Sequence, residues 1–141
     1  MSDSSFAHVD LGLDAVLNEL RPLEPIFHNR RFGLAAADRE RRTAPDFWEV
    51  GASGRRYSRE FIMKLFAETP PSDAQEAGWR CWDFGLRQLG PGPVYLLTYT
   101  LDQAGRLTRR ATVWHRAQPG WQILYHQGTV VASPSDDPAP A

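Results

Sequence analysis

Four long runs rich in β-branched and aromatic residues fill most of the second half of this chain and constrain its fold more than any other feature. They cover residues 79–89, 94–102, 107–116 and 121–131. The breaks between them are short, contain glycine and have the length of hairpin turns. Four successive strands joined by hairpins pair antiparallel. Because helices would separate the strands of a parallel α/β fold, the sequence predicts an α+β fold instead.

The first half of the chain is helical in pattern, beginning with a predicted helix over residues 10–28. Its first apolar residues recur at the i, i+3, i+4, i+7 spacing of one helix face: Leu13, Val16, Leu17 and Leu20. Pro22 and Pro25 each lack the backbone donor that a helix interior needs, so we expect a kink or a restart there. After the kink, the apolar face is expected to continue through Leu23, Ile26 and Phe27.

Shorter elements are expected between this helix and the four strands. They are a helix over residues 35–43, a strand over residues 47–51 and a third helix over residues 58–67. Gly51 and Gly54 flank the turn after the strand, where both are free to adopt positive φ. Ser58 is suited to cap the N-terminus of the third helix, because its hydroxyl can accept a bond from a free backbone N–H.

The length and the charge of the chain limit the class of protein. It has 141 residues, 16 basic and 17 acidic, with a net charge of -1. This balance argues against a partner such as nucleic acid or an anionic membrane, since both require a clear basic excess. We expect a single domain over residues 10–131, preceded by a flexible segment over 1–9. Residues 132–141 are rich in proline and acidic residues, which predicts a disordered tail.

Cysteine and histidine usage indicates neither a metal nor a cofactor. Cys81 is the only cysteine, which excludes an intramolecular disulfide and a Cys-rich zinc site, and we interpret it as a buried apolar residue. The histidines and acids do not have the spacing of metal ligands. The start has no signal-peptide pattern, and no apolar run approaches the ~18 residues of a membrane span. A cytoplasmic location is therefore expected.

Both faces of the predicted sheet carry apolar side chains. In the second long run, alternation separates Val94, Leu96, Thr98 and Thr100 from Tyr95, Leu97, Tyr99 and Leu101. In the last run, it separates Trp121, Ile123, Tyr125, Gln127 and Thr129 from Gln122, Leu124, His126 and Gly128. Helices can cover one face only, so we expect a homodimer through the other. The alternative is a strong curvature that makes both faces partly interior.

Five segments carry a resemblance to a known superfamily: Ala44–Gly54, Tyr57–Glu60, Leu96–Tyr99, Arg110–Trp114 and Trp121–Thr129. They form an acidic strand, a Ser-Gly turn, a Tyr-x-Arg helix entry, a strand ending in Trp, and a closing His-Gln-Gly-Thr. In this order they resemble the nuclear transport factor 2-like superfamily. Within it, they are most similar to the SnoaL-like branch, which is a domain of unknown function. The resemblance implies a cystatin-like α+β roll, with N-terminal helices packed on a strongly curved antiparallel or mixed sheet. The proline pair departs from the family's straight first helix.

Glu49 and His126 are the candidate catalytic residues. Glu49 stands between Trp48 and Val50, where burial would raise the pKa of its carboxyl and suit it to act as a general base or a ligand anchor. The alternative is a structural ion pair with Arg59 or Arg110. His126 is suited to acid–base chemistry or to holding a ligand oxygen. Its alternative is a structural histidine that ties the last strand to the Glu49 turn.

The resemblance also implies an apolar cavity between the sheet and the helices, with a few polar groups inside. The residues expected to line it are Trp48, Tyr57, Arg59, Tyr99, Arg110, Thr112, Trp114 and Gln127. Aromatic residues at strand spacing are also what a simple core requires, so this lining and a filled core remain alternatives.

Three functions are compatible with these residues. The first is a homodimer that binds a small apolar or mixed-polarity ligand in the pocket. The second is a cofactor-independent isomerase, cyclase or hydrolase, in which Glu49 or His126 transfers a proton. The third is a structural dimerisation module whose pocket is filled by its own side chains. The fold alone does not decide among them, because one fold supports many functions.

Overall fold

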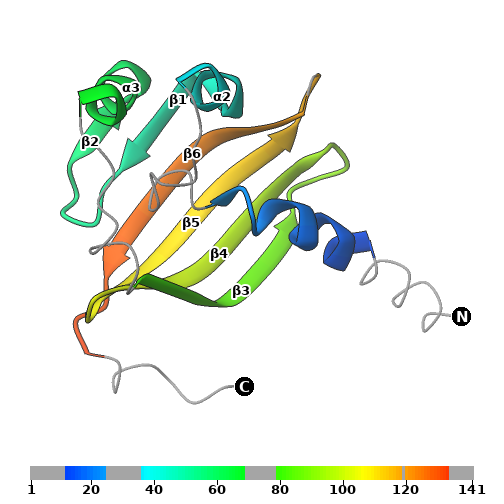
Figure 1. Ribbon diagram of the computed structural model, residues 1–141. Coiled ribbons are helices and arrows are strands. Elements are labelled where there is room, and N and C mark those ends of the chain that lie inside the picture. Colours follow the sequence, from blue (N-terminus) through cyan, green and yellow to red (C-terminus); the bar gives the residue numbers. More distant parts are fainter. Residues whose placement is uncertain (1–11, 25–35, 69–78, 119, 134–141) are drawn as a thin grey trace, which may run out of the picture.

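The computed structural model describes residues 12–24, 36–68, 79–118 and 120–133 (Figure 1). The predicted flexible N-terminus and nearly all of the predicted tail lie outside these ranges. So do residues 10–11 and 25–28 of the first predicted helix, and the loop before the first long strand. Within the described residues, no helix has both the length and the apolar character to cross a membrane.

Six strands form one mixed sheet in the order β2-β1-β6-β5-β4-β3. The elements are α2 (Ala36–Arg42), β1 (Thr43–Val50), β2 (Arg56–Ser58), α3 (Arg59–Glu68), β3 (Trp79–Gln88), β4 (Val94–Gln103), β5 (Arg106–Arg116) and β6 (Trp121–Val130). Strands β3 to β6 are an antiparallel meander, as predicted, while β1 pairs parallel with β6. The prediction of an α+β fold is confirmed. The short strand β2 was not predicted.

The first helix breaks where its two prolines predicted a kink or a restart. It covers residues 12–20 and passes into a turn through residue 24. The backbone N–H of Leu23 bonds to the carbonyl of Leu20 at 2.9 Å, which tightens the end of the helix. Pro22 explains this end, since its ring clashes with the preceding turn of a continuing helix. The expected break at the prolines is therefore present, and it takes the form of a turn.

The turn after β1 corrects one expectation about glycine. Gly54 has a positive φ of 89°, whereas the φ of Gly51 is not positive. A Cβ at Gly51 would lie 2.9 Å from the Tyr57 ring, so this position requires glycine for space instead. Ser58 caps α3 as predicted, because its hydroxyl accepts a hydrogen bond from the backbone N–H of Phe61 at 3.1 Å.

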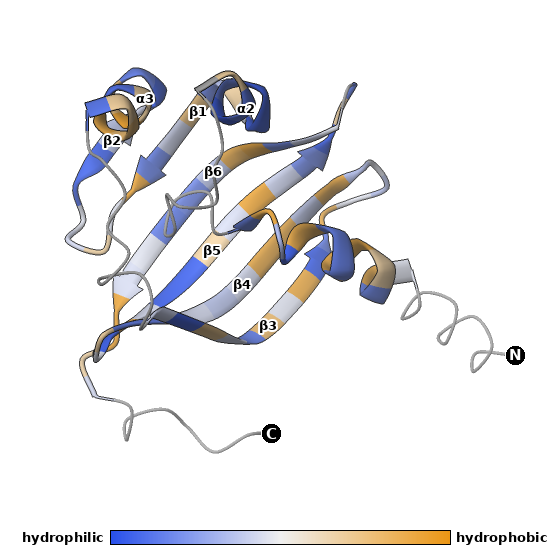
Figure 2. Ribbon diagram, in the orientation of Figure 1, coloured by the Kyte–Doolittle hydropathy of each residue, from blue (hydrophilic) through white to orange (hydrophobic). Residues whose placement is uncertain are grey.

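One face of the sheet, called the inner face below, packs against the helices, and the opposite one is the outer face. The helices contribute Leu20, Ile62 and Phe66 to a single core with inner-face side chains from β1, β4, β5 and β6. Figure 2 shows hydrophobic residues recurring along β4 and on the helix of residues 12–20. Cys81, expected to be buried, is exposed on β3, because β3 is an edge strand of the sheet.

A β-bulge in β6 changes which of its residues share a face. Trp114 on β5 pairs with Ile123, but the preceding Val113 pairs with Tyr125, so Leu124 is an extra residue. Simple alternation across the strand was therefore the wrong expectation. Trp121 and Ile123 lie on the inner face together with His126 and Gly128, and all four are buried. The bulge is what places the His126 imidazole in the core.

Candidate functional site

A buried carboxylate, Glu24, lies at the centre of a hydrogen-bond network on the inner face. Its side chain is only 1% exposed. Its Oε2 accepts bonds from the Tyr99 hydroxyl at 2.7 Å and the Thr112 hydroxyl at 2.8 Å, and its Oε1 accepts one from Trp114 Nε1 at 2.9 Å. The network joins the turn after the first helix to β4 and β5. It therefore fastens the helical layer to the sheet through polar contacts inside the core.

Burial raises the pKa of Glu24 to about 7, because removal from water disfavours its charged form. The three donors oppose this shift, and so does the positive charge of Arg110. The three donors each point at a carboxyl oxygen, so the site is suited to a carboxylate. Burial nevertheless makes the charged form costly, because it removes the carboxylate from water.

His126 extends the network on β6. Its Nδ1 lies 2.7 Å from the Thr112 hydroxyl and 3.8 Å from Glu24 Oε2. Burial and the charge of Arg110 lower the pKa of His126 to about 3, so the imidazole is neutral at physiological pH. When Glu24 is ionised, Thr112 uses its single proton to bond Glu24, and its oxygen then accepts a bond from the His126 Nδ1–H. His126 is thus held in one tautomer within the core.

Glu24 was not among the candidate residues from sequence, although a signal for it was present. It follows Leu20 by four positions and so continues the apolar spacing of Leu13, Val16 and Leu20. An acid on the apolar face of a helix is a buried-acid candidate. The two prolines around it favoured a break in the helix and obscured the position.

Glu49 is a second acid of the inner face, and its side chain is partly buried. On β1 it pairs with Tyr57 of β2 and with His126 of β6. Its Oε1 atom is buried and, among the described residues, has no hydrogen-bond partner. Burial raises its pKa to about 7, as the sequence predicted, and the charge of Arg110 opposes this shift. The carboxyl is therefore partly protonated at neutral pH and has one oxygen available to a ligand.

The two arginines considered as partners of Glu49 make other contacts. Arg59 bonds the Thr43 hydroxyl at 3.2 Å and the Glu40 carbonyl at 3.0 Å. Arg110 is 8% exposed, and its Nε donates to the Thr108 hydroxyl at 2.8 Å. No ion pair joins either arginine to Glu49 in the described part of the chain. Arg110 acts on Glu49 through charge without direct contact.

The remaining residues expected to line a pocket divide between the two faces. Those on the inner face are Tyr57, Tyr99, Arg110, Thr112 and Trp114. Trp48, by contrast, lies on the outer face, where it is 49% exposed and contacts the Tyr125 ring with centroids 4.7 Å apart. Gln127 also lies there and accepts a hydrogen bond from the Tyr125 hydroxyl. Arg59 begins α3 and reaches the junction of α2 and β1.

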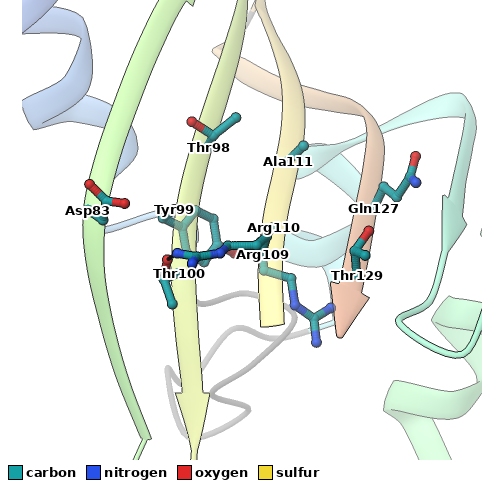
Figure 3. A pocket seen from close by; sticks show the side chains of 9 residues that line it. All are labelled: Asp83, Thr98, Tyr99, Thr100, Arg109, Arg110, Ala111, Gln127 and Thr129. Atoms are coloured by element: carbon teal, nitrogen blue, oxygen red, sulfur yellow. Dashed lines mark hydrogen bonds between the residues drawn. The ribbon is translucent and has the colours of Figure 1, made fainter. Parts of the chain in front are cut away.

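Two hollows open on the outer face. The larger, about 380 Å³, is lined by residues that include Asp83, Thr98, Arg109, Gln127 and Thr129. Figure 3 shows these side chains spread from β3 to β6, with Asp83 at one side and Gln127 at the other. The smaller, about 330 Å³, is lined by Asp46, Trp48, Val113, Leu124 and Tyr125. Among the described residues, no cluster of His, Cys, Asp and Glu has the arrangement of a metal site.

Comparison with solved structures places this architecture in a known fold. A nuclear transport factor 2-like protein from Cytophaga hutchinsonii has a TM-score of 0.60 at 15% identity, over 84% of this chain and 97% of that one. A DUF3225-family protein from Pectobacterium atrosepticum has a TM-score of 0.64 at 15% identity, over 85% and 91%. No protein-family sequence model and no curated protein matches the chain.

A third similar structure is that of a protein described as a ketosteroid isomerase. A ketosteroid isomerase-like protein from Parabacteroides distasonis has a TM-score of 0.53 at 15% identity, over 72% of this chain and 79% of that one. These likenesses show that the chain has the nuclear transport factor 2-like fold, also called cystatin-like. At such identities the likeness is one of fold, and function has to be argued from the site.

Proposed function

We propose that this chain binds a small molecule on the inner face of its sheet, with Glu49 as the polar anchor. The observation that carries the proposal is the buried Oε1 atom of Glu49, which lacks a hydrogen-bond partner among the described residues. Buried polar atoms in folded proteins are nearly always paired, so an unpaired acceptor indicates a place for a donor from outside the chain. The partly buried ring of Tyr57, beside Glu49 on β2, supplies apolar surface for the rest of a ligand.

Glu24 is not proposed as the anchor, although its pKa is raised to a similar value. Tyr99, Thr112 and Trp114 already bond both of its oxygens. A ligand would have to replace these buried donors and leave them unpaired, at a cost of about 1–3 kcal/mol for each. The Glu24 network therefore supports the wall of the site.

A thermal-shift screen of small polar compounds tests this function. A compound that binds the folded chain raises the unfolding temperature, and the shift grows with concentration over the dissociation constant. Compounds that bind at Glu49 should lose most of this effect in the Glu49→Gln variant. Asp46→Asn is the matched control, because Asp46 lies on the same strand and is exposed. Equal shifts in the wild type and in Glu49→Gln, for every compound, would reject the proposal.

A second candidate function, acid–base catalysis without a cofactor, is favoured by the pKa of Glu49. A general base works best with a pKa near the operating pH, and Glu49 at about 7 meets this condition. His126 does not, because a pKa of about 3 makes its imidazole too weak a base at neutral pH. Ketosteroid isomerisation is the reaction to test first, given the isomerase-like structure above. Loss of Glu49 should reduce kcat by about 10²–10⁴-fold, and an unchanged rate in Glu49→Gln would exclude Glu49 as the base.

We also propose that two copies associate through the outer face. Its apolar part includes the exposed Trp48 ring and the hollow formed with Val113, Leu124 and Tyr125. A solvent-exposed apolar patch of this kind is typical of an interface. Sedimentation at micromolar concentration should give the mass of a dimer, and Trp48→Arg should reduce it to that of a monomer. A monomeric wild type would reject the dimer without affecting the inner-face site.

A further inference from the structure

Glu49 and Arg110 face the inner side of the sheet as opposite charges, and in the described part of the chain no hydrogen bond or ion pair joins them. β6 lies between their strands, and their partners on β6, His126 and Gly128, are two residues apart, so the two backbones are about 12 Å apart at the usual strand spacing and rise per residue. Among the described residues, Glu49 Oε1 has no hydrogen-bond partner, and the Arg110 guanidinium donates its Nε–H to the Thr108 hydroxyl. The pair thus keeps an acceptor on one side of β6 and donors on the other.

Gly128 determines where the Arg110 guanidinium lies. Gly128 is the residue of β6 that pairs with Arg110, and a Cβ there would lie 2.7 Å from Arg110 Nη1 and 2.8 Å from its Cζ. The guanidinium therefore occupies the space that any side chain at this position would need. Because β6 is the strand next to β1, the missing side chain lets Arg110 extend toward Glu49.

We propose that the inner-face site selects molecules that carry a carboxamide group, with its N–H donated to Glu49 and its carbonyl bonded by Arg110. This inference rests on the small-molecule binding proposed above. A primary amide or a lactam presents a donor and an acceptor side by side on one planar, neutral group. An acceptor and a donor that lie across one strand are complementary to that arrangement.

Other common groups satisfy only half of the pair. An ester has no donor for Glu49, and an amine has no acceptor for Arg110. An ionised carboxylate also lacks a donor and brings a second negative charge next to Glu49. In each case a buried group stays unpaired after its water has been displaced, which weakens binding.

Three probes with the same ring and different polar groups test the proposal: benzamide, benzoate and methyl benzoate. Each is titrated into the purified chain at pH 8.5 and followed by ligand-observed NMR. At this pH the Glu49 carboxyl is ionised, because its pKa is about 7. We expect benzamide to bind at least about tenfold more tightly than the other two, the factor that corresponds to one lost charged hydrogen bond. Equal binding of benzamide and methyl benzoate would overturn the proposal.

Variants of the three residues then assign the contacts. Glu49→Gln and Gly128→Ala should each weaken benzamide binding by about tenfold, the second by displacing the Arg110 guanidinium. Gly92→Ala is the matched control, because a Cβ there meets no atom within 4 Å, and it should bind like the wild type. Thermal unfolding checks that each variant is folded. If Gly128→Ala does not fold, Arg110→Lys serves instead, since it keeps the charge and removes the planar donors.

The outcomes separate this inference from the function on which it rests. Full benzamide affinity in Gly128→Ala, or in Arg110→Lys, overturns the role of Arg110 and with it the carboxamide preference. If benzamide fails to bind while other screened compounds bind in a Glu49-dependent manner, the carboxamide class is wrong and the inner-face site stands. If no compound depends on Glu49, the proposed function itself fails.

Discussion

Two glutamates of the inner face share a pKa of about 7 and differ in the hydrogen-bond partners of their carboxyl oxygens. Glu24 is met by three donors from β4 and β5, whereas Glu49 keeps a buried oxygen that the described residues do not bond. Desolvation is the largest cause of the shift in both. A raised pKa therefore reports burial and does not by itself identify a functional acid. The hydrogen-bond partners distinguish an acid that stabilises the fold from one that is available to a ligand.

The largest effect is expected when each carboxylate is removed in turn. Glu24→Ala leaves three buried donors unpaired and should lower the free energy of unfolding by about 3–5 kcal/mol. Glu49→Ala removes a partly buried acid with an unpaired oxygen, so at pH 4.5, where the raised pKa has not yet cost stability, its effect should stay within about 1 kcal/mol. Denaturant unfolding of both variants measures the difference. Equal losses would show that Glu49 also has a structural role.

The second-largest expected effect concerns how the free energy of unfolding depends on pH. Both carboxyls have a pKa near 4.5 when unfolded and about 7 when folded, so the folded state binds more protons between these values. Their contribution is thus greatest below pH 4.5 and is lost as the pH rises to 7. His126 acts in the opposite sense, because its folded pKa of about 3 costs stability as the pH falls below 6.5.

The Glu49→Gln variant isolates one part of this profile. Relative to the wild type, its free energy of unfolding should rise by up to about 3 kcal/mol between pH 4.5 and 7, because it lacks the deprotonation that the wild type undergoes. Asp46→Asn serves as the control, because it removes an exposed carboxylate from the same strand. A constant difference between Glu49→Gln and the wild type over this range would show that the Glu49 pKa is not raised in the folded state.

The smallest test concerns the tyrosines beside the two acids. Tyr99→Phe removes one donor from Glu24 and should cost about 1–2 kcal/mol of stability. Tyr57→Phe, beside Glu49, should cost less than about 0.5 kcal/mol, since no hydrogen bond of its hydroxyl is found among the described residues. Thermal or denaturant unfolding compares the pair. A larger loss in Tyr57→Phe than in Tyr99→Phe would reverse the assignment of the two acids.

The sequence predicted the sheet better than it predicted the site. The four long strands and the end of the first helix near Pro22 follow from local patterns and turn residues, which act over a few positions. The bulge at Leu124 does not, because an extra residue in a strand depends on how its neighbour is paired. That single residue placed His126 on the face with Trp121, where alternation had separated them.

For the two acids, too, local sequence patterns predicted burial but did not predict contacts that depend on strand pairing. The apolar neighbours of Glu49 were enough to predict its burial and its raised pKa. They did not predict that Arg110 would approach across Gly128 without an ion pair, since this depends on the register of two strands. Glu24 continues the apolar spacing of the first helix, but its partners come from strands 75 to 90 positions later. Local patterns cannot show such contacts.

The parallel pairing of β1 with β6 also has a consequence for the order in which the domain folds. Glu49 pairs with His126, one of the last residues of the sheet, whereas β3 to β6 join neighbours through short hairpins. Closing the long loop costs more chain entropy and is slow, so the meander should assemble first and β1 should dock on it afterwards. During synthesis, β1 must wait until the ribosome has released β6. The pair of Glu49 and Arg110 thus comes together in the final stage of folding.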